Sequence, residues 1–208
     1  SSIGGKTAVN LNGIKNVIGA FYQPKAVLID SDVLQTLPPR QIANGLAEAL
    51  KMSLTSDAAL FDMFEKEDIL SNLDTIITRS ILIKKDVVEQ DEKEQGLRRI
   101  LNFGHTIGHA VESEEDLNCL YHGECVALGM LPMCAESLRP RVKAVLEKIG
   151  LPTEIRLDEA AALQALGHDK KREHTGTKVT FVTEPGKYII KTLQPEDFQP
   201  LLQMITLR

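Results

Sequence analysis

The chain has 208 residues, and its 24 lysines and arginines against 29 aspartates and glutamates give a net charge of −5 at pH 7. This acidity argues against a nucleic acid or an anionic membrane as partner, and the lack of tryptophan argues against base-stacking surfaces. A hydrophobic fraction of 43% with 25% charged residues is ordinary for a globular protein, which excludes disordered and fibrous classes.

No apolar run approaches the roughly 20 residues that span a bilayer, and the first ten residues lack the apolar stretch of a secretory signal. We therefore expect a cytoplasmic protein. Cys119, Cys125 and Cys134 are odd in number and form no CxxC pair, which favours reduced thiols over a disulfide framework.

The N-terminal part differs from the rest of the chain in its predicted secondary structure. Residues 1–24 are expected to form loop and strand, and KAVLID at 25–30 resembles a short buried strand. Pro38 and Pro39 suit the first turn of a helix, and the apolar spacing that follows predicts a helix over 40–54. We place a domain boundary near residues 37–38, which gives a segment 1–37 and a helical domain 38–208.

The remainder is predicted to be mainly α-helical. Ser71 and Asp74 resemble a capping box that opens a helix over 71–93. Further helices are predicted at about 97–113, 122–138, 140–149 and 158–166, with Pro140 ending the second of them and Gly150 closing the third. A β-hairpin is predicted from strands 178–182 and 187–193, because Pro185 and Gly186 supply a turn between them.

Two histidines stand four residues apart in LNFGHTIGHAVES, so His105 and His109 project from one face of a predicted helix. This spacing recurs in zinc sites, although such a pair can equally serve as ordinary hydrogen-bonding side chains. Thr106 stands where a zinc peptidase has its general-base glutamate, which excludes that class. His122, at a predicted helix start, is a candidate third histidine, or else a helix-end residue in a polar loop.

Glu48 is the candidate carboxylate ligand, because it lies on a helix that is otherwise apolar around it. Burying a carboxylate is costly unless the group is paired or bound to metal. The alternative is an ion pair with Lys51, three residues further on. Two imidazole nitrogens and one carboxylate oxygen would leave a zinc ion an open position for substrate.

Cations and amides surround these positions in the sequence. Arg98 and Asn102 are four apart and in phase with His105 if one helix carries all three, so we expect them to line one pocket. Such a pocket would suit a small anion bearing carboxylate or phosphate groups, although most single lysines and arginines are solvated surface.

Taken together, five motifs resemble the 3-dehydroquinate synthase family. They are SSIGGKTAVN (1–10), KNVIGAFYQP (15–24), LQTLPPRQIANGLAEALK (34–51), DEKEQGLRRILNFGHTIGHAVE (91–112) and HGECVALGM (122–130). The resemblance implies a phosphate-eliminating cyclase, a carbon–oxygen lyase of the shikimate pathway that converts 3-deoxy-D-arabino-heptulosonate 7-phosphate into 3-dehydroquinate. It implies NAD and a divalent metal, Zn²⁺ or Co²⁺, as cofactors, and a homodimer of the complete enzyme.

The resemblance also assigns roles residue by residue. It implies metal ligation by Glu48, His105 and His122; catalysis by His109, Lys51 and Lys84; substrate contacts by Lys6, Asn16, Lys84, Arg98, Asn102, His109 and one of Lys170 or Lys171; and NAD contacts by Lys6, Lys15, Val33, Leu34, Gln35 and Thr36.

The chain departs from the family pattern at its N-terminal side, where no GxGxxG follows a strand. We therefore expect the helical metal-binding domain with a remnant of the nucleotide-binding α/β domain, weak NAD binding and little activity by these residues alone. Other possibilities are a related sugar-phosphate cyclase, a metal-dependent glycerol or alcohol dehydrogenase, or, in another class, a non-catalytic helical metal-binding or assembly module.

Overall fold

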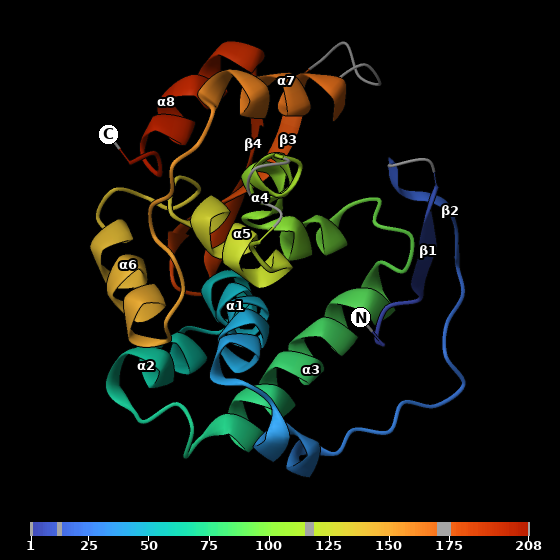
Figure 1. The fold of residues 1–208 in the computed structure, drawn as a ribbon. Coiled ribbons are helices and arrows are strands. Elements are labelled where there is room, and N and C mark those ends of the chain that lie inside the picture. The colour runs from blue at the N-terminus through green and yellow to red at the C-terminus, as the bar shows by residue number, and fades with distance from the viewer. Residues whose placement is uncertain (1, 12–13, 115–118, 170–175, 208) are drawn as a thin grey trace.

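The fold is mainly α-helical, as predicted, in a computed structural model that describes residues 2–11, 14–114, 119–169 and 176–207. Its described strands form two separate antiparallel pairs, one near each end of the chain (Figure 1). Within the described residues, no helix is long and apolar enough to cross a membrane.

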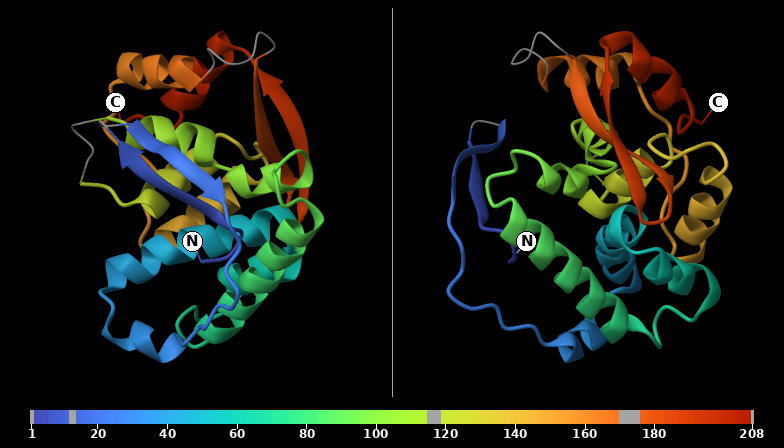
Figure 2. Two further views of the ribbon diagram at one scale, coloured as in Figure 1. Left: turned by 90° about the vertical axis from the view of Figure 1, so that its right-hand side faces the viewer. Right: turned by 180° about the vertical axis from the view of Figure 1, so that it is seen from behind.

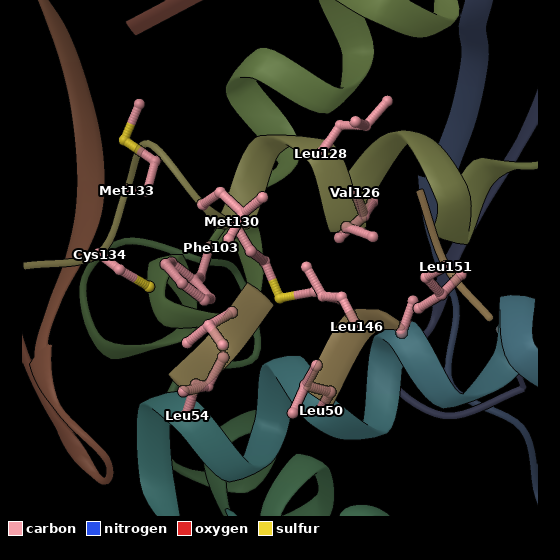
Figure 3. Packing of buried hydrophobic residues seen from close by; sticks show 14 of the residues in the cluster. Leu50, Leu54, Phe103, Val126, Leu128, Met130, Met133, Cys134, Leu146 and Leu151 are labelled. Atoms are coloured by element: carbon pink, nitrogen blue, oxygen red, sulfur yellow. The ribbon is translucent and has the colours of Figure 1, made fainter. Parts of the chain in front are cut away.

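Three helices form the centre of the molecule: α1 (Pro39–Ser56), α4 (His105–Glu112) and α5 (His122–Met130). Every residue of α5 after His122 is buried, and this helix packs against both α1 and α4. Figure 3 shows Leu50 and Leu54 of α1 facing Val126 and Met130 of α5 across the core. This packing fixes the relative positions of the three helices that carry the histidines and Glu48.

Helices α2 (Ala58–Lys66), α3 (Leu73–Gln90) and α6 (Arg139–Lys148) surround this centre (Figure 1). The sequence reasoning did not single out α2, and the helix after Ser71 begins later than predicted. The proposed capping box is wrong, because Asn72 is the N-cap of α3 and the Ser71 amide instead donates to Asp68 Oδ2. Gly150 follows α6 with a φ of 79°, the left-handed conformation expected of a glycine that closes a helix.

The C-terminal part combines α7 (Glu159–Asp169), strands β3 (Thr177–Glu184) and β4 (Lys187–Leu193), the 3₁₀ turn η5 (Pro195–Asp197) and α8 (Phe198–Gln203). The predicted hairpin is confirmed, since β3 and β4 pair antiparallel and Gly186 takes a φ of 75° in the turn. The buried side of β3 packs against the helical core through Val179 and Val182.

The N-terminal hairpin lies to one side of the helical core, as the right-hand view of Figure 2 shows. Strands β1 (Lys6–Leu11) and β2 (Ile14–Phe21) pair antiparallel with Lys6 opposite Phe21. The strand predicted at 25–30 is wrong: this segment is extended without a partner strand, and Leu28 is 98% exposed. It leads into the 3₁₀ turn η1 (Ser31–Thr36), and the boundary proposed near 37–38 stays a prediction.

The single helix predicted over 97–113 is also wrong. Residues Leu97–Asn102 form the 3₁₀ turn η2, and Gly104 then takes a φ of 76° before α4 begins at His105. A side chain on Gly104 would lie 2.8 Å from the Val126 oxygen, so the close approach of α5 requires glycine here. The helix predicted over 122–138 likewise ends at Met130.

Candidate metal and substrate site

Glu48, His105 and His122 lie together although they come from three helices. Glu48 is in α1, and the two histidines are the first residues of α4 and α5. Glu48 Oε1 is 3.4 Å from His105 Nε2 and 3.7 Å from His122 Nε2. One ligand-type atom from each of the three residues falls within 4.8 Å of the others.

This spacing matches the donor set of a divalent metal. Zinc held tetrahedrally by nitrogen and oxygen at about 2.0–2.1 Å places neighbouring ligand atoms about 3.4 Å apart. In addition, Glu48 Oε1 is buried and has no hydrogen-bond partner within the described residues. A buried carboxylate oxygen without a partner is costly, so the chemistry of the site fits a cation there.

The other oxygen of Glu48 is paired with Lys51. Lys51 Nζ donates to Glu48 Oε2 at 2.6 Å, and its residue is only 2% exposed. Burial lowers the pKa of Lys51, whereas for Glu48 the effect of burial is outweighed by Lys51 and the two histidines, which hold its pKa well below its usual range. The ion pair and the metal-type cluster therefore coexist, each using a different oxygen.

Each candidate histidine ligand has a partner on its other ring nitrogen. His105 Nδ1 lies 3.1 Å from the Phe103 carbonyl oxygen, and His122 Nδ1 lies 3.4 Å from Glu112 Oε2. Both partners are acceptors that can hold a proton on Nδ1, which is the tautomer that leaves Nε2 able to bind a metal, while the Glu48 carboxylate raises the pKa of His122. Burial and the charge of Lys51 lower the pKa of His105 to about 3, so its ring is neutral.

His109 borders the same cluster without facing Glu48 at ligand distance. Its ring centroid lies 5.4 Å from that of His105 and 5.9 Å from that of His122. His109 also has a ligand-type atom within 4.8 Å of Glu112 and His122. The structure thus brings all three histidines of the two motifs into one site.

Cations gather on one side of this cluster. Burial, together with the charges of Lys51 and Arg98, lowers the pKa of the Lys84 ammonium. The charge of Lys6 also lowers the pKa of Lys51 and that of Lys84. Lys84 of α3 is therefore repelled by cations from α1, η2 and β1, an arrangement that attracts an anion.

Arg98 reaches this region from η2 and is not in phase with His105 on one helix, contrary to expectation. It is buried, donating from Nη1 to the Glu92 oxygen at 2.5 Å and from Nη2 to the Gly4 oxygen at 2.6 Å. Its Nε is buried without a partner in the described part of the chain. Asn102 and Lys6 both bind the carboxylate of Glu94.

The remaining predicted residues are placed less fully. Lys15 and Asn16 belong to β2, but only their backbone is described, and Lys170 and Lys171 lie outside the described residues. The stretch Val33–Thr36 lies in η1, where Val33 is 64% exposed.

Sequence reasoning missed several residues that the structure brings to the site. Glu94 and Glu112 lie within the motifs already quoted, but their partners lie on other elements and no spacing rule names them. Glu94 is the one described non-glycine residue with a positive φ, of 59°, which directs its carboxylate to Lys6 and Asn102.

Family models match nearly all of this site. The model described as 3-dehydroquinate synthase C-terminal matches residues 45–172, and the one described as 3-dehydroquinate synthase N-terminal matches residues 1–44. The chain belongs to the 3-dehydroquinate synthase family. The resemblance stated from the motifs is therefore confirmed, and the two models together match residues 1–172.

Curated relatives in the 3-dehydroquinate synthase family agree over most of the chain. The 3-dehydroquinate synthase of Nostoc punctiforme is 44% identical, covering 95% of this chain and 60% of its own length. That of Methylacidiphilum infernorum is 48% identical, covering 99% of this chain and 60% of its own length. The chain thus spans about three fifths of the curated relatives it matches.

Solved structures give the same fold. A 2-epi-5-epi-valiolone synthase from Streptomyces hygroscopicus with NAD⁺ and Zn²⁺ bound has a TM-score of 0.86 at 27% identity, covering 98% of this chain and 62% of that one. A 2-deoxy-scyllo-inosose synthase complexed with carbaglucose-6-phosphate, NAD⁺ and Co²⁺ has a TM-score of 0.83 at 25% identity, covering 97% of this chain and 62% of that one.

Proposed function

We propose that this chain is the metal- and substrate-binding part of a 3-dehydroquinate synthase. The reaction is conversion of 3-deoxy-D-arabino-heptulosonate 7-phosphate into 3-dehydroquinate and phosphate, with NAD and a divalent metal as cofactors. The observation that carries this proposal is the unpartnered buried oxygen of Glu48, facing two imidazole nitrogens beside four cations. The two relatives described above that are named for this activity are 44% and 48% identical, which supports it.

Glu48, His105 and His122 would hold the metal. When bound, a Zn²⁺ or Co²⁺ ion supplies Lewis-acid polarisation of a substrate oxygen. The neutral ring of His105 and the acceptors on the far nitrogens of both histidines keep the three donors ready for a cation.

The cation cluster would bind the anionic groups of the substrate. Lys84 and Arg98 are proposed to contact its carboxylate or phosphate. Lys6 and Asn102 would also contact the substrate, after releasing the Glu94 carboxylate that both of them bind. His109, exposed beside the ligands, is positioned to exchange a proton with a substrate oxygen. The proposed contacts of Asn16, Lys170 and Lys171 stay predictions.

NAD is the second expected cofactor. Within the described residues, no glycine-rich turn joins a strand to a helix, the arrangement that cradles a pyrophosphate. We propose only that Lys6, Lys15 and the stretch Val33–Thr36 border it. A homodimer of the complete enzyme stays a prediction.

A related sugar-phosphate cyclase is the second candidate function, because both structural relatives described above are cyclases of other names. Their identities of 27% and 25% are well below those of the named synthases, which favours the first candidate. The two candidates differ in substrate, since only the heptulosonate carries a carboxylate.

The decisive experiment measures phosphate release with NAD and zinc, using this chain joined to the N-terminal part of the Nostoc punctiforme relative. We expect release from the heptulosonate phosphate and none from the analogue in which the carboxylate is a hydroxymethyl group. Release from the analogue alone would favour the second candidate, and release from neither would refute the first. The chain by itself serves as the low-activity control.

A further inference from the structure

The first turn of α5 carries His122, and one amide of this turn donates to a side chain of another helix. Gly123 N donates to Asn44 Oδ1 of α1 at 2.6 Å. An oxygen in this place normally belongs to the helix's own N-cap side chain, which here is Tyr121. Asn44 thus caps α5 from a neighbouring helix and ties the residue after His122 directly to α1.

Arg40 of α1 also forms hydrogen bonds with this turn. Its Nε and Nη2 donate to Glu124 Oε1 and Oε2 at 2.6 and 2.8 Å, and Nη2 also donates to the Cys119 oxygen at 2.8 Å. Glu124 is only 5% exposed and accepts from Tyr121 N at 2.7 Å. The Arg40 guanidinium lies 4.5 Å from the centre of the Tyr121 ring, so it contacts one residue before His122, Tyr121, and one after it, Glu124.

The spacing along α1 connects these ties to the metal cluster. Arg40, Asn44 and Glu48 follow one another at intervals of four residues, so they lie along one face of the helix. The backbones also meet closely there: a Cβ on Gly123 would lie 2.1 Å from the Asn44 carbonyl oxygen. One face of α1 therefore both provides the Glu48 ligand and sets the place where α5 begins.

We propose that Arg40 and Asn44 are positioning residues of the metal site, which fix the start of α5 on α1 so that His122 Nε2 faces Glu48 Oε1. The inference rests on the proposed metal-binding function. Asn44 acts through the Gly123 amide, and Arg40 acts through the Glu124 carboxylate, which in turn accepts from the Tyr121 amide.

The test is the zinc dissociation constant of the chain, measured by competition with a chromophoric chelator well below the unfolding midpoint of each zinc-free variant. We expect Arg40→Ala and Asn44→Ala each to weaken zinc binding about tenfold, the size typical of losing a residue that orients a ligand. Asn44→Asp keeps an acceptor oxygen for Gly123 N and should restore most of the affinity.

Arg141→Ala is the matched control. Arg141 makes the same two-bonded contact with Glu65, at 2.8 and 2.6 Å, and lies 5.1 Å from the centre of the Phe61 ring, but it joins α6 to α2 away from the cluster. Its loss should leave the zinc dissociation constant unchanged.

The outcomes separate the two proposals. Zinc binding by the unaltered chain with equal affinity in Arg40→Ala and Asn44→Ala would overturn the positioning role and leave the metal site standing. An equal loss in Arg141→Ala would show a general stability effect and also overturn it. No zinc binding by the unaltered chain would refute the metal site, and the positioning role with it.

Discussion

The two carboxylate oxygens of Glu48 have different partners. Oε2 accepts from Lys51 Nζ at 2.6 Å, whereas Oε1 faces Nε2 of His105 and His122 at 3.4 and 3.7 Å. A carboxylate between apolar neighbours requires a compensating group, and either a metal or Lys51 could supply it. Because each of them uses its own oxygen, the two alternatives do not compete.

Removing individual histidines tests which of them would bind metal. His122→Ala should lower zinc occupancy of the dialysed protein severely, because one of three donors is lost, whereas His109→Ala should keep most of it, since Nε2 of His105 and of His122 both remain. Elemental analysis after mild dialysis gives the stoichiometry. Equal occupancy in the two variants would contradict the assigned ligand set.

Asp91 predicts a pH dependence of stability. Its carboxylate accepts from the amides of Gln95, Gly96 and Arg98 at 2.8 to 2.9 Å, and these bonds lower its pKa below the ordinary value of about 3.9. A lowered folded-state pKa contributes stability that is present above the unfolded value and is lost as the pH falls through the folded one.

We therefore expect Asp91→Asn to destabilise the chain at neutral pH and to flatten the fall of its melting temperature between about pH 5 and pH 2. Scanning calorimetry over this range checks the expectation. The control is Glu89→Gln, since the ion pair of that carboxylate within the described residues is a 3.5 Å contact with Lys85. If the melting temperature of Asp91→Asn falls as steeply at low pH as that of the unaltered chain, Asp91 is not the source of this pH dependence.

The sequence predicted the candidate site residues better than the residues that hold them in place. His105, His109, His122 and Glu48 are visible because each is an unusual residue in its local pattern. Arg40, Asn44, Glu94 and Glu112 looked like ordinary surface residues, since their partners lie on elements that are adjacent only after folding.

At the scale of the elements, periodicity found the long helices and failed where glycine interrupts them. The run 97–113 has continuous helical character in sequence, yet contact with α5 requires the left-handed Gly104 and divides it. The apolar residues of 25–30 resemble a buried strand because pattern alone cannot show whether a partner strand exists.

The end of α2 depends on one lysine from another helix. Lys148 Nζ of α6 donates to the carbonyl oxygens of Phe64, Glu65 and Glu67 at 2.9, 3.2 and 2.7 Å. A cation at these last carbonyls also opposes the negative end of the helix dipole. Lys148→Met keeps the aliphatic stem and should reduce the free energy of unfolding by about 1 kcal/mol.

Urea denaturation of Lys148→Met measures this change. Lys66→Met is the control, because the ion pair of Lys66 among the described residues is with Asp62 on its own helix. Equal losses in both variants would mean that the cap contributes nothing beyond a surface charge.

At the scale of the whole molecule, the N-terminal hairpin is less well packed than the helical core. The described contacts that tie β1 to the rest include Gly4 with Arg98 and Lys6 with Glu94, and Gln23 beyond β2 binds Glu92 at 3.0 Å. Apolar side chains of the hairpin such as Val9 and Ile18 are 61% and 56% exposed. Two strands without a covered face are marginal in water.

Hydrogen exchange should therefore divide the chain. We expect amides of β1 and β2 to exchange orders of magnitude faster than those of α5, whose residues after His122 are buried. Mass spectrometry of peptic fragments resolves the two regions. Protection of the hairpin equal to that of α5 would show that the polar ties alone hold it.

The three-helix origin of the metal cluster has a thermodynamic consequence for the whole chain. Glu48, His105 and His122 are far apart in sequence, so an unfolded chain cannot present them together, and a bound ion would act as a reversible cross-link between α1, α4 and α5. Free zinc at a hundred times its dissociation constant would then add about 2.7 kcal/mol to the free energy of unfolding by mass action. Under that linkage, the amount of folded chain in a chelating solution depends on the trace zinc that the solution contains.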